Sequence, residues 1–312
     1  MDNQYNITFS INRLHLLFAM VTLYSLLKNN KEYYFNVYIL HNNCLNQNEI
    51  DDICNKFPLN QFNNFKIHLV DVSYLEIMER LPILVRYPAE IFFKLFPPVL
   101  FSNMDKILHL DTDVLVIGDI KEFLETNMNN IYFMGDKNQK NGICAGVLLI
   151  NLSDLRENHN ILADMEKEFL LDNKISEETF FNKVYKNHTK FTPHNYIYTT
   201  EGDINSKIDN STRIIHFTVP KPYVLSRFKI KDLNTKGVKE YFTYLSDFIE
   251  PKYKWQFKIL KFYTFYLGST INSLERNTHR IWSKYIKKEK VFQYKSSFLT
   301  KKIYKYATIK SK

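Results

Sequence analysis

Cysteine and glycine are both scarce in this sequence of 312 residues. The three cysteines, Cys44, Cys54 and Cys144, are odd in number and form no Cys-x-x-Cys pair, so we expect neither a disulfide framework nor a zinc site. A reducing compartment fits this cysteine usage best. The seven glycines argue against a fibrous chain, and none belongs to a Gly-x-x-x-x-Gly-Lys-Ser/Thr phosphate loop. A phosphate group would therefore have to be bound through a metal ion and basic side chains.

Long apolar segments are missing as well. Near the N-terminus the longest uncharged apolar run, residues 14–27, has fourteen residues and includes a few polar ones. A helix that spans a bilayer needs about 20 apolar residues, so we expect a buried helix here. We expect no signal peptide either, because no basic stretch precedes an apolar run at the N-terminus.

Positive charge is concentrated at one end of the sequence. The net charge is +9, yet residues 251–312 contain sixteen Lys or Arg and two acidic residues, which gives +14 for this segment and −5 for residues 1–250. Such an asymmetry predicts an anionic partner for the basic segment, either a nucleic acid or a membrane surface.

Short apolar strands alternate with helices, which predicts an α/β fold with a mostly parallel central sheet. The predicted strands are residues 7–9, 35–40, 65–70, 106–110, 114–117, 131–134, 147–150 and 211–217. The predicted helices are residues 16–28, 47–56, 89–100 (ended by Pro97 and Pro98), 166–171 and 177–185. We expect one Rossmann-like domain, residues 1–250, and then a basic helical tail, residues 251–312.

The sharpest local feature is Asp111-Thr112-Asp113, which follows one apolar strand and precedes another. Open α/β sheets bind ligands beyond the carboxyl ends of their strands. Two carboxylates that face one cavity repel each other unless a cation lies between them, and oxygen ligands suit a divalent metal. A solvated turn is the plainer interpretation of an isolated Asp-x-Asp, but the flanking buried strands make it less natural here.

A second feature is the sequence HFTVPKPY, residues 216–223, at the end of the last predicted strand. The imidazole of His216 can complete a metal site, and Lys221, held between two prolines, can reach a phosphate as a point charge. The alternative for His216 is a strand-end residue that makes one backbone hydrogen bond.

Five segments in the right order resemble glycosyltransferase family 8, which includes bacterial lipopolysaccharide galactosyl- and glucosyltransferases and glycogenin. They are ITFSIN (7–12), AEIFFKL (89–95), KILHLDTDVLV (106–116), CAGVLLINL (144–152) and HFTVPKPY (216–223). Together they cover roughly residues 5–225. The resemblance implies a GT-A type nucleotide-sugar domain that transfers a hexose from a UDP-sugar and retains its anomeric configuration.

The resemblance also implies roles for individual residues. Asp111, Asp113 and His216 would hold Mn²⁺, or Mg²⁺ in its place. The substrate-binding residues would be Ser10, Asn12, Arg86, Lys94, Asp111, Thr112, Cys144, Ala145, Val219 and Lys221.

Several positions depart from the family pattern. Asn12 stands where many members have Asp, and Leu14 falls near a usual polar contact to the uridine. Cys144 replaces the Asn of NAGV, Val219 replaces the Gly of HFTG, and Thr179 replaces an acid of DQD. UDP is still the expected nucleotide, while the sugar is left open.

Glu177 and Glu178 occupy the place of the family's DQD segment. By the resemblance, Glu177 would contact the sugar or acceptor, and Glu178 would lie near the reacting carbon. A carboxylate there can act as a nucleophile or stabilise the transition state, as in retaining glycoside hydrolysis. Asp113, Glu177 and Glu178 are thus the catalytic candidates. The alternative is a helix start, with Ser176 as N-cap and two acids in the first turn, and both interpretations can hold together.

The basic tail, residues 251–312, also carries many Trp, Tyr and Phe side chains. Such a segment predicts attachment to an anionic membrane surface, whereas binding of single-stranded nucleic acid and a solvated helical appendage are the alternatives. Family members that build lipopolysaccharide have similar C-termini, which favours the membrane, so no nucleic-acid partner is expected.

The sequence therefore predicts a hexosyltransferase that moves galactose or glucose from a UDP-sugar to an oligosaccharide or glycolipid acceptor of the lipopolysaccharide type. We expect it in the cytoplasm, bound peripherally to the inner face of the bacterial cytoplasmic membrane. A degenerate, non-catalytic nucleotide-sugar-binding protein is the main alternative. A nucleotidyltransferase also pairs acids with a metal, but it usually has the glycine-rich loop that is missing here.

Overall fold

The computed structural model describes residues 3–56, 58–82, 84, 88–138, 142–200, 207–218 and 236–248. The chain divides into two compact units, residues 1–51 with 61–216, and residues 52–60 with 217–312. The predicted basic tail, together with Arg86, Val219 and Lys221, lies outside the described residues. The sheets and the candidate site belong to the first unit.

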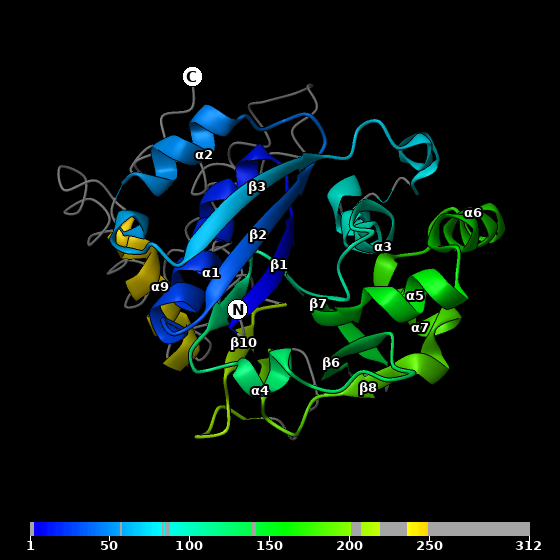
Figure 1. Cartoon of the computed structure of the whole chain (residues 1–312). Coiled ribbons are helices and arrows are strands. Elements are labelled where there is room, and N and C mark those ends of the chain that lie inside the picture. Colours follow the sequence, from blue (N-terminus) through cyan, green and yellow to red (C-terminus); the bar gives the residue numbers. More distant parts are fainter. Residues whose placement is uncertain are drawn as a thin grey trace, which may run out of the picture. The chain divides into compact units, whose positions relative to one another are not determined.

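A seven-stranded sheet forms the centre of the first unit, in the order β3-β2-β1-β4-β7-β6-β8 (Figure 1). Its strands are β1 Gln4–Ser10, β2 Tyr34–His41, β3 Phe65–Asp71, β4 Lys106–Leu110, β6 Phe133–Lys137, β7 Ile143–Asn151 and β8 Thr189–Phe191. The pairs β3-β2, β2-β1, β1-β4 and β6-β8 are parallel, and only β7 pairs antiparallel, with β4 and β6. The predicted α/β fold with a mostly parallel sheet is confirmed.

A smaller sheet in the order β5-β10-β9 continues directly from β4. It consists of β5 Val114–Val116, β10 Ile214–His216 and β9 Ile197–Thr199. β10 runs antiparallel to β5, and this register places His216 opposite Val114. Since β4 ends at Leu110 and β5 begins at Val114, the Asp-x-Asp segment is the link between the two sheets.

Helices complete the fold. The α-helices are α1 Leu16–Asn29, α2 Gln47–Cys54, α3 Pro97–Leu100, α4 Lys121–Leu124, α5 Leu152–Asn158, α6 Ile161–Leu171, α7 Glu177–Val184 and α9 Lys236–Asp247. The 3₁₀ helices are η1 Arg13–His15, η2 Leu59–Gln61, η3 Glu76–Arg80, η4 Ala89–Leu95 and η5 Lys186–His188. None of the helices in the described part of the chain is long and apolar enough to cross a membrane.

Helix α1 is the buried helix expected from the long apolar run. Every residue from 16 to 27 is buried, so this part of the helix is covered on all sides. Its polar side chains hold the smaller sheet, since the Thr22 hydroxyl donates to the Val114 carbonyl at 2.8 Å and the Val116 amide donates to the Ser25 hydroxyl at 3.0 Å. This contact fixes β5, and with it the residues just before β5.

The prediction of one helix over residues 89–100, ended by its prolines, is wrong. Residues Ala89–Leu95 form the 3₁₀ helix η4, and Pro97 and Pro98 begin α3 instead of ending a helix. A proline in the first turn of a helix loses no hydrogen bond, because the first amides have no partner within the helix. The strands β8 and β9 and the helices α4 and α5 were not predicted from the sequence.

A large hydrophobic cluster packs η4 against the sheet and α7. It contains Phe92, Phe93 and Phe96 around η4, and Phe180 and Phe181 from α7. Because apolar neighbours anchor η4 on both sides of Lys94, the side chain of Lys94 is forced into the interior.

Candidate metal centre

Asp111, Asp113 and His216 converge where the two sheets meet. One ligand atom of each lies within 4.8 Å of the others. Among the residues that the structure describes, no other group of three acidic, His or Cys side chains meets this spacing. Asp111 follows β4, Asp113 precedes β5, and His216 arrives on the neighbouring strand β10. The three residues predicted to hold a metal are thus brought together.

The spacing of these side chains suits a divalent cation. Nε2 of His216 lies 3.5 Å from Oδ1 of Asp113, and both side chains are buried. Two ligand atoms that are each about 2.1 Å from one cation lie about 3–3.5 Å apart. Two carboxylates with one imidazole form a donor set that accepts Mn²⁺ or Mg²⁺.

The ring of His216 rests on a position without a side chain. A Cβ atom added to Gly146 of β7 would lie 2.0 Å from Cε1 and 2.2 Å from Nε2 of His216. On the other edge of the ring, Nδ1 lies 3.6 Å from Sγ of Cys144. Burial lowers the pKa of His216, but Cys144 and then Asp113 outweigh burial and raise it to about 10. A cation and a proton therefore compete for this ring.

Lys94 is a buried cation beside the cluster, with a side chain only 1% exposed. Its Nζ donates to Oδ1 of Asp111 at 2.9 Å and to the carbonyl of Ala145 at 3.0 Å, and it lies 3.7 Å from Oε1 of Glu177. Burial would lower the pKa of Lys94, but Asp111 and Glu177 outweigh it and raise the pKa above its usual value. Lys94 thus places one positive charge beside two of the predicted site acids.

His109 provides a second hydrogen bond to Asp111. Its Nε2 lies 3.0 Å from Oδ1 of Asp111, the same oxygen that Lys94 contacts. Burial lowers the pKa of His109 to about 4, so the ring is neutral at pH 7. Burial would raise the pKa of Asp111, but Lys94 first and His109 second hold it well below its usual value. The Oδ2 atom of Asp111 is therefore the one left for a cation.

The neutral ring of His109 carries a cost. Its Nδ1 is buried and has no hydrogen-bond partner among the described residues. An unsatisfied buried polar atom costs about 1–3 kcal/mol of stability. The sequence signal for this residue was its spacing, since residues i and i+2 of a strand share one face and His109 precedes Asp111 by two.

Helix α7 presents the two glutamates to the same region. The predicted N-cap is confirmed, because the Ser176 hydroxyl accepts a hydrogen bond from the Thr179 amide at 3.2 Å. Burial raises the pKa of Glu177, although Lys94 opposes the shift. Glu178 accepts hydrogen bonds from the Asn138 amide group at 2.7 Å and from the backbone amide of Ala145 at 3.3 Å. The capping role and the site location hold together.

Three successive residues of β7 organise the centre. Cys144 faces His216. The carbonyl of Ala145 accepts a hydrogen bond from Lys94, and its amide donates one to Glu178. The carbonyl of Gly146 accepts a hydrogen bond from the Asp111 amide at 2.8 Å, and the missing side chain of Gly146 leaves room for the His216 ring. Cys144 and Ala145 were predicted at the site. The need for a glycine at residue 146 was not predicted, because it depends on what packs across the sheet.

The remaining predicted residues of the described chain surround this edge. Ser10 ends β1, which pairs in parallel with β4, so the segment after Ser10 emerges at the same edge as Asp111. Oδ1 of Asn12 caps η1 by accepting from the Leu14 amide at 3.1 Å. Thr112 is buried, and its carbonyl lies 3.5 Å from the hydroxyl of Thr22 in α1.

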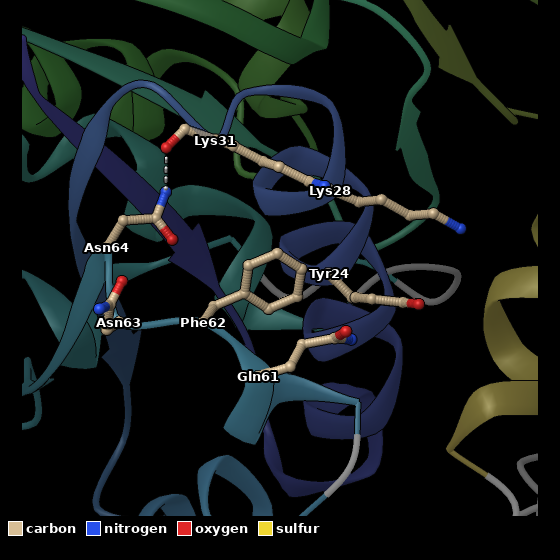
Figure 2. A pocket seen from close by; sticks show the side chains of 7 residues that line it. All are labelled: Tyr24, Lys28, Lys31, Gln61, Phe62, Asn63 and Asn64. Atoms are coloured by element: carbon tan, nitrogen blue, oxygen red, sulfur yellow. Dashed lines mark hydrogen bonds between the residues drawn. The ribbon is translucent and has the colours of Figure 1, made fainter.

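A separate cavity of about 300 Å³ lies elsewhere in the first unit (Figure 2). It is lined by Tyr24, Lys28, Lys31, Gln61, Phe62, Asn63 and Asn64. Residues 63 and 64 precede the amino end of β3, whereas Asp111 follows the carboxyl end of the parallel strand β4. This cavity is therefore at the opposite end of the strands from Asp111, Asp113 and His216.

Comparisons with known proteins agree with the fold. The model of the family described as glycosyl transferase family 8 matches residues 6–223. This range includes Asp111, Asp113 and His216. The lipopolysaccharide 1,2-glucosyltransferase of Escherichia coli is 22% identical over 255 residues, 70% of this chain and 73% of that protein.

Two solved structures share the fold. The galactosyltransferase LgtC, crystallised with donor and acceptor sugar analogues, has a TM-score of 0.61 at 17% identity and covers 77% of this chain and 94% of its own. The apo form of the glycosyltransferase GlyE of Streptococcus pneumoniae has a TM-score of 0.61 at 16% identity, over 78% of this chain and 60% of its own.

Proposed function

The chain belongs to glycosyltransferase family 8, and from this premise we propose that it is a retaining hexosyltransferase. It would move galactose or glucose from a UDP-sugar to an oligosaccharide or lipopolysaccharide-type acceptor. The cluster of Asp111, Asp113 and His216 at the carboxyl end of β4 carries the proposal. The donor and acceptor analogues bound to LgtC, and the lipopolysaccharide activity named for the Escherichia coli relative, support the substrate classes.

The proposed cation is Mn²⁺, or Mg²⁺ in its place, held by Oδ2 of Asp111, Asp113 and Nε2 of His216. When bound, it supplies a Lewis acid that neutralises charge on the departing diphosphate. Lys94 keeps Asp111 ionised and directed, because its Nζ lies 2.9 Å from the carboxylate in a buried position. Lys221, outside the described residues, would add a positive charge to the diphosphate.

The two glutamates of α7 would act on the sugar. Glu178 is directed by hydrogen bonds from Asn138 and from the main chain of Ala145, and this preorganisation suits a group that stabilises positive charge on the reacting carbon. Glu177, buried next to Lys94, would contact the sugar or acceptor. The acceptor hydroxyl would attack on the face from which UDP leaves, which retains the configuration.

Donor hydrolysis is the direct test of this proposal. The purified protein is incubated with Mn²⁺ and a panel of UDP-, GDP- and CMP-sugars, and free nucleotide is measured. We expect slow release of UDP from one UDP-hexose, and its loss in Asp113→Asn. Stabilisation by UDP without release of nucleotide would favour the non-catalytic binding protein. If no donor gives either nucleotide release or stabilisation, both functions are refuted.

The tail is the basis of a proposal about location. Residues 251–312 carry a net charge of +14. From this charge we infer that the tail attaches the protein reversibly to the inner face of the bacterial cytoplasmic membrane. Each basic residue near an anionic leaflet contributes about 1 kcal/mol, so several are enough for peripheral binding.

A further inference from the structure

Two buried side chains touch the proposed metal ligands without being ligands themselves. His109 contacts Asp111, and Cys144 contacts His216. We propose that His109 and Cys144 are positioning residues, which determine the atoms that Asp111 and His216 present to the cation. This inference rests on the metal site of the proposed function.

His109 selects the oxygen of Asp111. The side chain of Asp111 is 30% exposed, so burial alone leaves it some freedom to rotate. Lys94 and His109 both approach Oδ1, at 2.9 and 3.0 Å, and this arrangement leaves Oδ2 for the cation. His109 itself cannot move, because its strand is paired on both sides and its ring is fully buried.

Packing alone does not account for a histidine at this position. Nε2 of His109 must carry the ring proton to donate to a carboxylate, so Nδ1 is a buried acceptor without a partner among the described residues. An apolar side chain of similar size would avoid that loss. A residue that lowers stability and orients a metal ligand is expected of a functional position.

Cys144 acts on the nitrogens of His216. The ring directs Nε2 toward Asp113 and Nδ1 toward the sulfur of Cys144, and it occupies the space that Gly146 leaves free by having no side chain. A cation bound at Nε2 requires the remaining ring proton on Nδ1. Sulfur is a weak acceptor for that proton, which favours the tautomer with its lone pair on Nε2.

The test measures metal affinity and stability separately. Binding of Mn²⁺ alone is followed by calorimetric titration of the full chain, and thermal unfolding is followed without metal. For His109→Leu we expect Mn²⁺ affinity to fall about 10–100-fold while the metal-free unfolding midpoint is unchanged or higher. For Cys144→Ala we expect a similar fall, and for Cys144→Ser we expect affinity to recover, because a hydroxyl also accepts from Nδ1.

Cys54→Ala is the matched control, since it makes the same change on α2, in a residue outside the metal cluster. If the unaltered chain binds Mn²⁺ and both His109→Leu and Cys144→Ala bind it within twofold, the positioning role is refuted and the metal site stands. The positioning role is also refuted if the variants lose Mn²⁺ affinity only in proportion to a lower unfolding midpoint and Cys144→Ser does not restore the affinity. If the unaltered chain does not bind Mn²⁺ or Mg²⁺, the proposed function fails instead.

Discussion

Replacement of Gly146 by alanine is the sharpest perturbation that the structure offers. The new Cβ atom would lie 2.0 Å from Cε1 of His216, whereas carbon atoms pack at about 3.5–4.0 Å. The imidazole must therefore retreat by about 1.5 Å. Metal–ligand distances tolerate only about 0.2 Å, so a displaced ring cannot bind the same cation as Asp113.

The expected result has two parts. Overpacking should lower the free energy of unfolding by about 1–3 kcal/mol, because β7 is buried along its whole length and cannot shift. Loss of one of three ligands should weaken Mn²⁺ binding by at least about 10-fold. Chemical denaturation measures the first effect, and calorimetric titration with Mn²⁺ measures the second.

Gly118→Ala serves as the control for this experiment. A Cβ atom at residue 118 would lie 2.5 Å from Cδ of Arg213, but this contact is with a flexible and partly exposed side chain that can move aside. We expect nearly unchanged stability and unchanged Mn²⁺ binding. If Gly146→Ala binds Mn²⁺ as tightly as the unaltered protein, then His216 is not a metal ligand in the position that the structure gives it.

Three further results are expected. Lys94→Met should lower the free energy of unfolding by up to about 3–5 kcal/mol in urea denaturation, because it leaves Asp111 without its buried cation. A decrease below about 1 kcal/mol would show that the ion pair is not required for stability. Glu178→Gln preserves the contact with Asn138 but removes the charge, so turnover should fall by about 10²–10³ while UDP binding is kept; unchanged turnover would exclude an essential carboxylate. Removal of residues 251–312 should abolish flotation with anionic vesicles, and a truncated protein that still floats would contradict the role given to the tail.

Local patterns were sufficient for much of the fold. The helix at residues 16–28 and the short strands on either side of the Asp-x-Asp segment were predicted from the spacing of apolar residues that are close in sequence. The structure confirms them as α1, β4 and β5. The prediction that Pro97 and Pro98 end a helix is wrong, since a proline that ends one helical segment can equally begin the next.

The sequence by itself determined the family, the α/β fold and the two carboxylates of the candidate metal centre, because the residues responsible lie in contiguous segments. Only the tertiary structure decided how His216 reaches those carboxylates, through the pairing of β10 with β5 about 100 residues away in sequence. It also decided that Gly146 makes room for that ring, that His109 contacts Asp111 and that Cys144 contacts His216. Such contacts cross from one strand to another, and no local pattern in the sequence specifies which side chains will meet there.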